Sequence, residues 1–303
     1  MLKSFRDIEE EVKKLRKRRV VVPAAGNTCI LEAALEARER DLADFTLIDS
    51  KERLFATLSE LNFSKSRLQN FEIVEEEDCN EAARMAVSMV REGKADLLAK
   101  GRLQTFELMK AVLDKAQGLR EESSLLCDIM VIEKPLSPDA KLIGMSDPAL
   151  CVAPTASDLV KVSKNCLPVM KRFGYEVIRC AFLAALEVEK ESMPATVRAA
   201  EAARELRESE EGVEAQGPLS FDIACSPRAA AVKKLSTPVA GQADLLIVPN
   251  IETGNVLAKT IAVFTNAQYG HLVLGAQVPV VMSSRSDSSL SKFNSILLGL
   301  LSA

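Results

Sequence analysis

Histidine is nearly absent from this sequence, because His271 is the only one among 303 residues. A Ser-His-Asp hydrolase needs an imidazole where strands end, whereas His271 lies at the start of an expected strand. Zinc sites in proteins also rely largely on histidine and on grouped cysteines. The sequence therefore argues against a Ser-His-Asp hydrolase and against a zinc protein. We expect no metal ion, since a metal site would have to be built from carboxylates alone.

Paired cysteines and long apolar runs are also missing. The seven cysteines are an odd number without CxxC spacing, which is typical of reduced residues in a cytosolic protein. No run reaches the roughly 18 to 20 apolar residues that span a bilayer. The N-terminal MLKSFRDIEEEVKK predicts a charged helix rather than a signal peptide. We expect a cytoplasmic protein with no membrane contact.

Nucleic-acid and nucleotide-binding signatures are weak as well. The net charge is −4, and lysines and arginines are scattered apart from KKLRKRR at 13–19, so the basic stripe of a nucleic-acid surface is missing. VPAAGNT, after the first expected strand, matches neither GxGxxG nor GxxxxGK[ST]. We interpret Asn27 or Thr28 as an ordinary helix N-cap and expect no nucleic-acid partner.

What the sequence does contain is a regular alternation of short apolar runs and amphipathic helical patterns. Hydrophobic residues make up 48% of the chain and charged residues 27%, which is typical of a globular protein. The alternation predicts βα units and parallel sheets, hence an α/β fold. Two domains are expected, because single cores stop growing near roughly 250 to 300 residues.

Hydroxyl and cationic side chains follow several of the expected strands. In parallel sheets, ligands bind beyond the carboxyl ends of the strands. The groups that these ends carry are Lys100, Gly101, Arg102 and Thr105; Ser146 and Asp147; Asn250, Glu252, Gly254 and Asn255; and Ser283, Ser284 and Arg285. Such a set suits an oxyanion or a phosphate that is held by charge-assisted hydrogen bonds.

Six blocks in the same order resemble the phosphate acetyltransferase and phosphate butyryltransferase family, and the butyryl branch more closely. They are AKGRLQTFELMKAVLD (99–114), MSDPALCVAPTASDLV (145–160), MPATVRAAEAA (193–203), QGPLSFDIA (216–224), STPVAGQADLLIVPNIETGNVLAK (236–259) and VMSSRSDSSLSKFNSI (281–296). The resemblance covers about residues 90–303, and residues 1–90 fit by pattern only.

The resemblance implies reversible acyl transfer, in which acyl phosphate and coenzyme A give acyl-CoA and inorganic phosphate by direct thiolate attack in a ternary complex. Coenzyme A is then a co-substrate, and no tightly bound cofactor is expected. It also implies two three-layer α/β domains of the isocitrate dehydrogenase type with a cleft between them, and a homodimer. The implied domains are 1–139 plus 277–303, and 140–276.

The resemblance also assigns roles to individual residues. The family's Ser-Arg pair matches Ser284 and Arg285 here, and the planar guanidinium fork of Arg285 suits phosphate oxygens bidentately. With these two, we expect Asp287 to be catalytic. The residues expected to bind substrate are Lys100, Arg102, Thr105, Lys110, Asp147, Glu252, Gly254 and Asn255. Without the family blocks, SSRSDSS would be interpreted as a solvated loop in which Asp287 or Ser288 caps a helix.

Two positions depart from the family pattern. The acetyl branch has an aspartate one helical turn beyond its Ser-Arg pair, where this chain has Ser291. Either Asp287 replaces it as the base, or Arg285 and Lys100 favour the thiolate electrostatically. The second departure is Asn250, where the family usually has aspartate. These departures leave a non-catalytic acyl-CoA-binding paralogue as an alternative, whereas a dehydrogenase of similar fold would need a carboxylate metal cluster.

Overall fold

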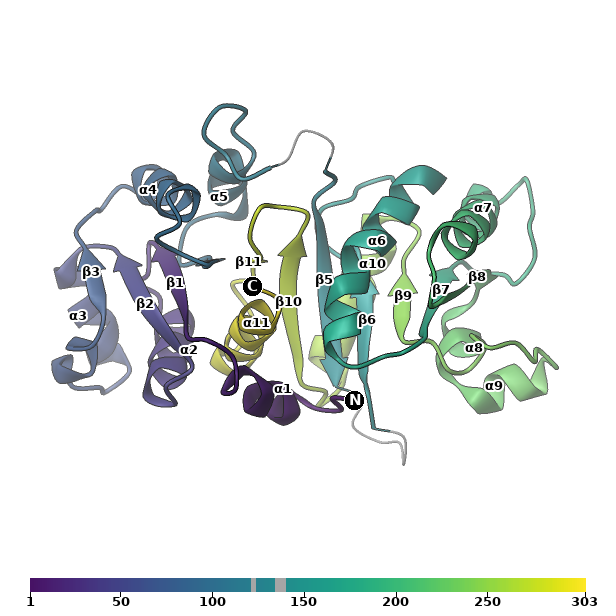
Figure 1. Ribbon diagram of the computed structural model, residues 1–303, viewed down its shortest axis with the longest axis horizontal. Coiled ribbons are helices and arrows are strands. Elements are labelled where there is room, and N and C mark those ends of the chain that lie inside the picture. Colours follow the sequence, from purple (N-terminus) through teal and green to yellow (C-terminus); the bar gives the residue numbers. More distant parts are fainter. Residues whose placement is uncertain (121–123, 134–139) are drawn as a thin grey trace. The chain divides into compact units, whose positions relative to one another are not determined.

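The computed structural model describes residues 1–120, 124–133 and 140–303. These residues form two compact units, which are described one at a time. Unit 1 comprises Met1–Ser4 and Leu125–Gln268, and unit 2 comprises Phe5–Ser124 and Tyr269–Ala303. Figure 1 shows the elements of both units, and the described helices and strands give an α/β fold as predicted.

The division between the units falls earlier in the chain than the boundaries that we predicted at 139/140 and 276/277. Residue 139 itself lies outside the described residues. Strand β5 (Cys127–Glu133) pairs antiparallel with β6 (Leu142–Ser146), so it belongs with the second domain rather than with the first. Strand β10 (Tyr269–Leu274) packs against α11 (Ser289–Ser302) and therefore belongs to unit 2.

Unit 2 is built on a sheet with the strand order β3-β2-β1-β4-β11-β10, parallel except for β10. Its strands are β1 (Arg18–Pro23), β2 (Ala43–Ile48), β3 (Glu72–Val74), β4 (Leu97–Ala99), β10 and β11 (Val280–Val281). Its helices are α1 (Phe5–Val12), α2 (Thr28–Glu39), α3 (Lys51–Glu60), α4 (Cys79–Arg91), α5 (Thr105–Val112) and α11, with a 3-10 turn at Lys65–Leu68.

The strand order of unit 2 has a switch point between β1 and β4. From β1 the chain moves outward to β2 and β3, and it then returns through α4 to β4 on the other side of β1. Right-handed crossovers place α2 and α3 on one face of the sheet and α4 on the other. Ligands of open α/β sheets bind where the direction of the strand order reverses. In unit 2 this point is the carboxyl edge shared by β1, β4 and β11.

Unit 1 has the strand order β5-β6-β9-β7-β8, with β5 antiparallel to its neighbour. Its remaining strands are β7 (Ile178–Leu183), β8 (Val213–Leu219) and β9 (Leu245–Ile247). Its helices are α6 (Ala156–Arg172), α7 (Pro194–Ser209), α8 (Phe221–Cys225), α9 (Pro227–Val232) and α10 (Ile251–Phe264). The carboxyl ends of β6 and β9 are adjacent, which brings Asp147 near the start of α10.

Helix starts follow the local signals of the sequence. Asn27 caps α2 by accepting a hydrogen bond from the Ile30 N–H at 3.3 Å, which confirms the N-cap interpretation of VPAAGNT. Ser50 caps α3, and Pro194 is the first residue of α7. Local chemistry therefore fixes where the elements begin.

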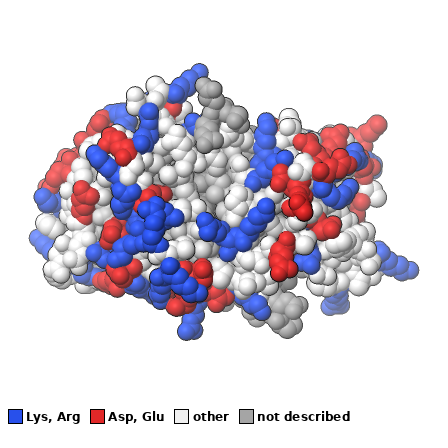
Figure 2. All heavy atoms as spheres, in the orientation of Figure 1, with Lys and Arg blue, Asp and Glu red and all other residues white. Residues whose placement is uncertain are grey.

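Charged side chains of both signs are interspersed over the face that Figure 2 draws. Among the described helices, none combines the length and the apolar character that crossing a bilayer requires.

Candidate active site

The loop that follows β11 is held by a buried carboxylate. Asp287 is 4% exposed, and its Oδ2 accepts the Ser284 N–H at 2.6 Å while its Oδ1 accepts the Tyr269 hydroxyl at 3.3 Å. The Asp287 N–H donates in turn to the Ser284 carbonyl oxygen at 3.2 Å. Both carboxylate oxygens are thus engaged in fixing the turn that presents Ser284 and Arg285. Ser288 caps α11, so the capping alternative holds for Ser288.

Lys292 holds the same loop from the first turn of α11. Its Nζ donates to Ser283 Oγ at 3.1 Å and to the Ser284 carbonyl oxygen at 2.8 Å. The side chain is 4% exposed, and burial lowers the pKa of its ammonium, against the opposing effect of Asp287. Our interpretation of the sequence missed Lys292. The available signal was a lysine inside the apolar pattern of the last helix.

Lys100, the residue after β4, is a second buried ammonium group. It is 3% exposed, and within the described residues its Nζ donates only to the carbonyl oxygens of Leu103 at 3.3 Å and Gly101 at 3.5 Å. Burial, with the positive charges of Lys292 and Arg285, lowers the pKa of Lys100 from 10.5 to about 8. Two carboxylates, Asp287 and Glu107, partly oppose that shift. No carboxylate within the described chain makes an ion pair with Lys100.

Arg285 is exposed at the tip of the loop. Its guanidinium has no hydrogen bond or ion pair to the described residues, yet its charge acts on Lys100. The neighbouring Ser284 Oγ lies 3.1 Å from Ser286 Oγ, the only side-chain partner that its hydroxyl has in the described chain. Ser284 and Arg285 therefore present one hydroxyl and one uncommitted fork beside two buried cations.

Gly101 lets the β4 loop approach the end of β1. A Cβ at this position would lie 2.3 Å from the Pro23 carbonyl oxygen and 2.1 Å from that of Ala24. The next residue, Arg102, donates its backbone N–H to the Ala24 oxygen at 2.7 Å. Only glycine allows this contact, which sets the position of Lys100 at the switch point.

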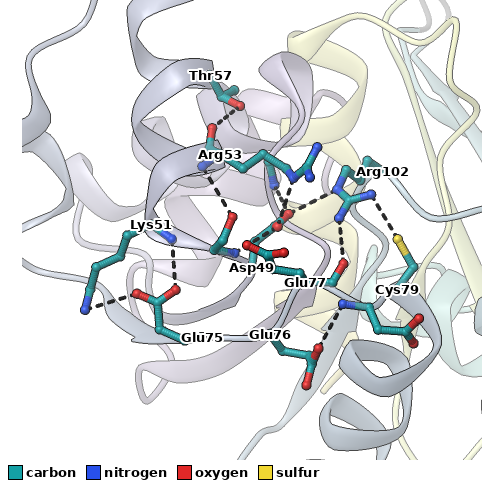
Figure 3. Close-up of polar contacts among 12 residues, drawn as sticks. Asp49, Lys51, Arg53, Thr57, Glu75, Glu76, Glu77, Cys79 and Arg102 are labelled. Carbon is teal, nitrogen blue, oxygen red and sulfur yellow. Dashed lines mark hydrogen bonds and ion pairs between the residues drawn. The ribbon is translucent and has the colours of Figure 1, made fainter.

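Arg102 is held by unit 2 itself rather than left available to a ligand. Its Nε pairs with Asp49 Oδ2 at 3.2 Å, and its two terminal nitrogens donate to Cys79 Sγ at 3.0 Å and the Glu77 carbonyl oxygen at 3.2 Å (Figure 3). Burial lowers the pKa of Arg102, whereas the hydrogen bond to Asp49 raises it. The net effect is a raised pKa. All its nitrogens make intramolecular contacts, which points to a structural role beside any contact with substrate.

Asp49 is the centre of that network. Its carboxylate is fully buried at the end of β2, and it accepts the backbone N–H groups of Gly26 and Ser50, each at 2.9 Å. It also pairs with Arg53 at 3.3 Å and with Arg102 (Figure 3). One carboxylate thus connects the loops after β1, β2 and β4 to helix α3.

Helix α5 carries the two remaining candidates of unit 2. Thr105 is its exposed first residue. Lys110 is also exposed and lines a cavity of about 420 Å³ between α4 and α5. Glu107 lines the same cavity and is one of the charges that act on Lys100.

In unit 1, Asp147 is buried and accepts three backbone N–H groups. Its Oδ1 accepts those of Ala149 at 2.6 Å and Leu150 at 2.7 Å, and its Oδ2 accepts that of Asp128 at 2.9 Å. Burial and the Asp128 charge raise the pKa of Asp147, and the three hydrogen bonds oppose this. Asp147 therefore shapes the loop after β6.

The start of α10 packs against that loop. Asn250 caps the helix by accepting the Thr253 N–H at 2.9 Å, a role for which asparagine and aspartate are equivalent. Gly254 is buried against the Asp147 backbone, and Asn255 Nδ2 donates to the Pro148 carbonyl oxygen at 3.3 Å. Glu252 is exposed. Capping explains how Asn250 is accommodated where the family usually has aspartate.

The structure thus gathers the predicted residues into two groups, one in each unit. In unit 2, the loop after β11 carries Ser284, Arg285 and Asp287, and Lys100 lies close enough for the charges of Arg285 and Asp287 to act on it. Arg102 belongs to the adjacent Asp49 network. Thr105 and Lys110 lie along α5. In unit 1, Asp147, Gly254 and Asn255 meet at the ends of β6 and β9, and Glu252 stands at the surface beside them.

The fold and the loop define an α/β protein that gathers cations at the ends of its strands. The model of one family, described as "Phosphate acetyl/butaryl transferase", matches residues 64–300. The chain belongs to this family of phosphate acyltransferases, which confirms the resemblance drawn from the six sequence blocks.

The chain is similar to curated relatives along almost its whole length. It is 34% identical to a phosphate butyryltransferase of Clostridium acetobutylicum, over 100% of this chain and 99% of that protein. It is 33% identical to a phosphate acetyltransferase of Thermotoga maritima, over 95% and 96% of the two chains. A branched-chain phosphotransacylase from Enterococcus faecalis superimposes with a TM-score of 0.83 and 31% identity, covering 94% of this chain and 98% of that one.

Proposed function

We propose that this chain interconverts acyl-CoA plus inorganic phosphate with acyl phosphate plus CoA, and that its acyl groups are short and butyryl-like. One observation carries the proposal: the Arg285 guanidinium, which has no partner among the described residues, lies next to Ser284 beside two buried ammonium groups, in a chain with 34% full-length identity to a phosphate butyryltransferase. The preference for short chains rests on the butyryl and branched-chain relatives.

The chemistry requires stabilisation of two developing charges. The CoA thiolate attacks the acyl carbon of the acyl phosphate, so a C–S bond forms, the C–O bond to phosphate breaks, and its electron pair stays on the phosphate oxygen. The planar fork of Arg285 suits that oxygen and its neighbours bidentately. The Ser284 hydroxyl donates to the phosphate or to the acyl carbonyl oxygen. Loss of one such donor typically raises the barrier by about 2.7 to 4 kcal/mol.

We assign Asp287 a positioning role in place of the base that we expected. Its two oxygens accept the Ser284 N–H and the Tyr269 hydroxyl, and the residue is only 4% exposed, so little of the carboxylate is open to a bound thiol. Of the two alternatives that the sequence left open, electrostatic support for the thiolate is therefore favoured. Lys100 supplies part of it together with Arg285.

The remaining predicted residues of both units contribute to substrate binding in this proposal. Lys110 and Thr105 bind substrate along α5, and Arg102 acts through the loop that it holds. Unit 1 contributes four further substrate-binding residues, namely Asp147, Glu252, Gly254 and Asn255. Coenzyme A is a co-substrate and no tightly bound cofactor is required. We further propose a cytoplasmic homodimer that binds neither nucleic acid nor membrane.

The proposed reaction is tested by mixing the purified protein with butyryl-CoA and phosphate and following the release of free thiol. We expect turnover that depends on phosphate, and a panel of linear and branched acyl-CoAs then ranks chain length. One methylene changes discrimination by only about 1 to 3 kcal/mol, so neighbouring chain lengths should overlap. Binding of acyl-CoA without turnover on any member of the panel would establish the non-catalytic alternative instead.

The role of Arg285 is tested by Arg285→Lys, which keeps the charge and removes the fork. We expect kcat/KM to fall at least about tenfold with an unchanged melting temperature, because bidentate contact to phosphate is lost. Arg16→Lys is the matched control, because Arg16 is exposed and its ion pair is with Asp96 at the surface. An unaffected rate in Arg285→Lys would remove this residue from the site.

A further inference from the structure

Unit 2 buries two lysines at positions where apolar side chains would be expected to give a more stable fold. Lys100 and Lys292 are 3% and 4% exposed, the positive charge of Lys292 acts on Lys100, and the Lys292 ammonium group also donates to the Ser284 loop. A buried charge is costly unless it is paired, and replacing buried ionic groups by apolar ones of similar size is often neutral or stabilising. The fold alone therefore gives no reason to keep both.

The charges around Lys100 come from three elements, and their sum is positive. Lys292 faces it from α11, Arg285 and Asp287 from the loop after β11, and Glu107 from α5. Lys100, Lys292 and Arg285 carry three positive charges against two carboxylates. Asp287 is already shared between Ser284 and Tyr269, and Glu107 accepts the Gln104 N–H at the start of α5. The cluster is thus short of one anion.

We propose that Lys100 and Lys292 form a buried cationic pair that serves the acyl transfer itself, with Lys292 as a positioning residue for Ser283 and Ser284 and both lysines favouring the bound thiolate and phosphate dianion. This inference rests on the proposed function. It adds Lys292 to the site and explains what stabilises the CoA thiolate, namely the two ammonium charges. The thiol releases its proton to water, and no side chain has to accept it.

The geometry gives the two lysines different tasks. Lys292 donates to Ser283 Oγ and to the Ser284 carbonyl oxygen, while Asp287 holds the Ser284 N–H, so the peptide group on each side of Ser284 is fixed by a different charge. Lys100 has no such structural partner in the part of the chain that the structure describes, where its Nζ donates only to two carbonyl oxygens at 3.3 and 3.5 Å. A dianion beside Lys100 would also raise its pKa and keep it charged.

Lys100→Met and Lys292→Met separate a functional role from a structural one. Methionine keeps the apolar stem of the side chain and removes the charge. We expect Lys100→Met to melt at or above the wild-type temperature, because it breaks no ion pair, whereas Lys292→Met loses two hydrogen bonds and should melt lower. Both variants should show kcat/KM lower by at least about tenfold, in line with the loss of charged groups that act on the transition state. Lys292→Arg should recover part of the rate.

Ser295→Ala is the matched control. Ser295 is buried in the same helix, accepts the His271 N–H at 2.8 Å and donates to the Ser291 carbonyl oxygen at 2.8 Å, away from the Ser284 loop. We expect Ser295→Ala to lower the melting temperature while kcat/KM stays near that of the wild type.

The decisive readout is the pH profile of kcat at saturating CoA, which reports the ionisation of the bound thiol. Removing one positive charge should move its acidic limb to higher pH by about one unit, because the thiolate then forms less readily. If the wild type turns over and both methionine variants keep its rate and profile, the pair has no catalytic role. If the wild type itself fails to turn over, the proposed function fails first, which is a separate result.

Discussion

Lys100 shows how the burial of a single charged residue limits stability. Its pKa falls from 10.5 to about 8 in the folded chain. Between these two values the unfolded state binds more protons than the folded state, so raising the pH through this window stabilises the fold. At neutral pH, where Lys100 is protonated in both the folded and the unfolded state, the same shift lowers the free energy of unfolding by roughly 3 kcal/mol.

Stability measurements at two pH values test this assignment. We expect Lys100→Met to gain the most stability over the wild type near pH 7, and the gain to shrink as the pH rises from about 8 toward 10.5. Urea unfolding at pH 7 and pH 10 measures it, with Lys115→Met, an exposed lysine that follows α5, as the control. A gain that is equal at both pH values would contradict the shifted ionisation of Lys100.

At the scale of elements, the Asp49 network determines how three loops meet. Asp49→Asn keeps the size of the side chain but removes the charge that faces Arg102 and Arg53. We expect a loss of roughly 3 kcal/mol of unfolding free energy, because a partly buried cation is left without its partner. Urea unfolding measures it, with Glu75→Gln as the control, since Glu75 pairs with Lys51 at the surface. Equal midpoints for the two variants would show that the network adds nothing to stability.

Helix α10 and the loop after β6 depend on a close backbone contact. A Cβ on Gly254 would lie 2.6 Å from the Asp147 carbonyl oxygen and 2.8 Å from Pro148 Cα, and backbone atoms cannot move aside cheaply. Gly254→Ala should destabilise the chain by about 1 to 3 kcal/mol, the usual range for overpacking. Thermal unfolding of this variant beside Thr253→Ala, which changes an exposed neighbour, checks the expectation. Similar melting temperatures would mean that the contact relaxes.

For the whole molecule, elements and caps could be predicted because their signals are local. The alternation of apolar runs and helical patterns predicted the α/β order, and Asn27 marked a helix start by its own chemistry. The family blocks then pointed to Ser284 and Arg285. Their roles, like those of the other predicted site residues, remain proposals.

What the sequence left open depends on contacts between distant segments. Asp49 is 53 residues from Arg102, and no spacing rule shows that this pair forms. The same holds for Asp287, whose oxygens are taken up by Ser284 and Tyr269, and for Lys292, whose burial follows from how α11 packs. The domain boundaries differed for a similar reason, because strand pairing decides to which unit β5 belongs.

Unit 2 is assembled from two stretches of chain that are separated by all of Leu125–Gln268. Ribosomes add about 5 to 20 residues per second, so strand β4 waits roughly 9 to 36 s for its neighbour β11. During that interval helix α2 lacks α11, its packing partner, and the nascent chain shows apolar surface that a chaperone can bind. Ser284, Arg285 and Lys292 follow β11 in the chain, so the proposed site forms only after the second stretch of unit 2 has been made.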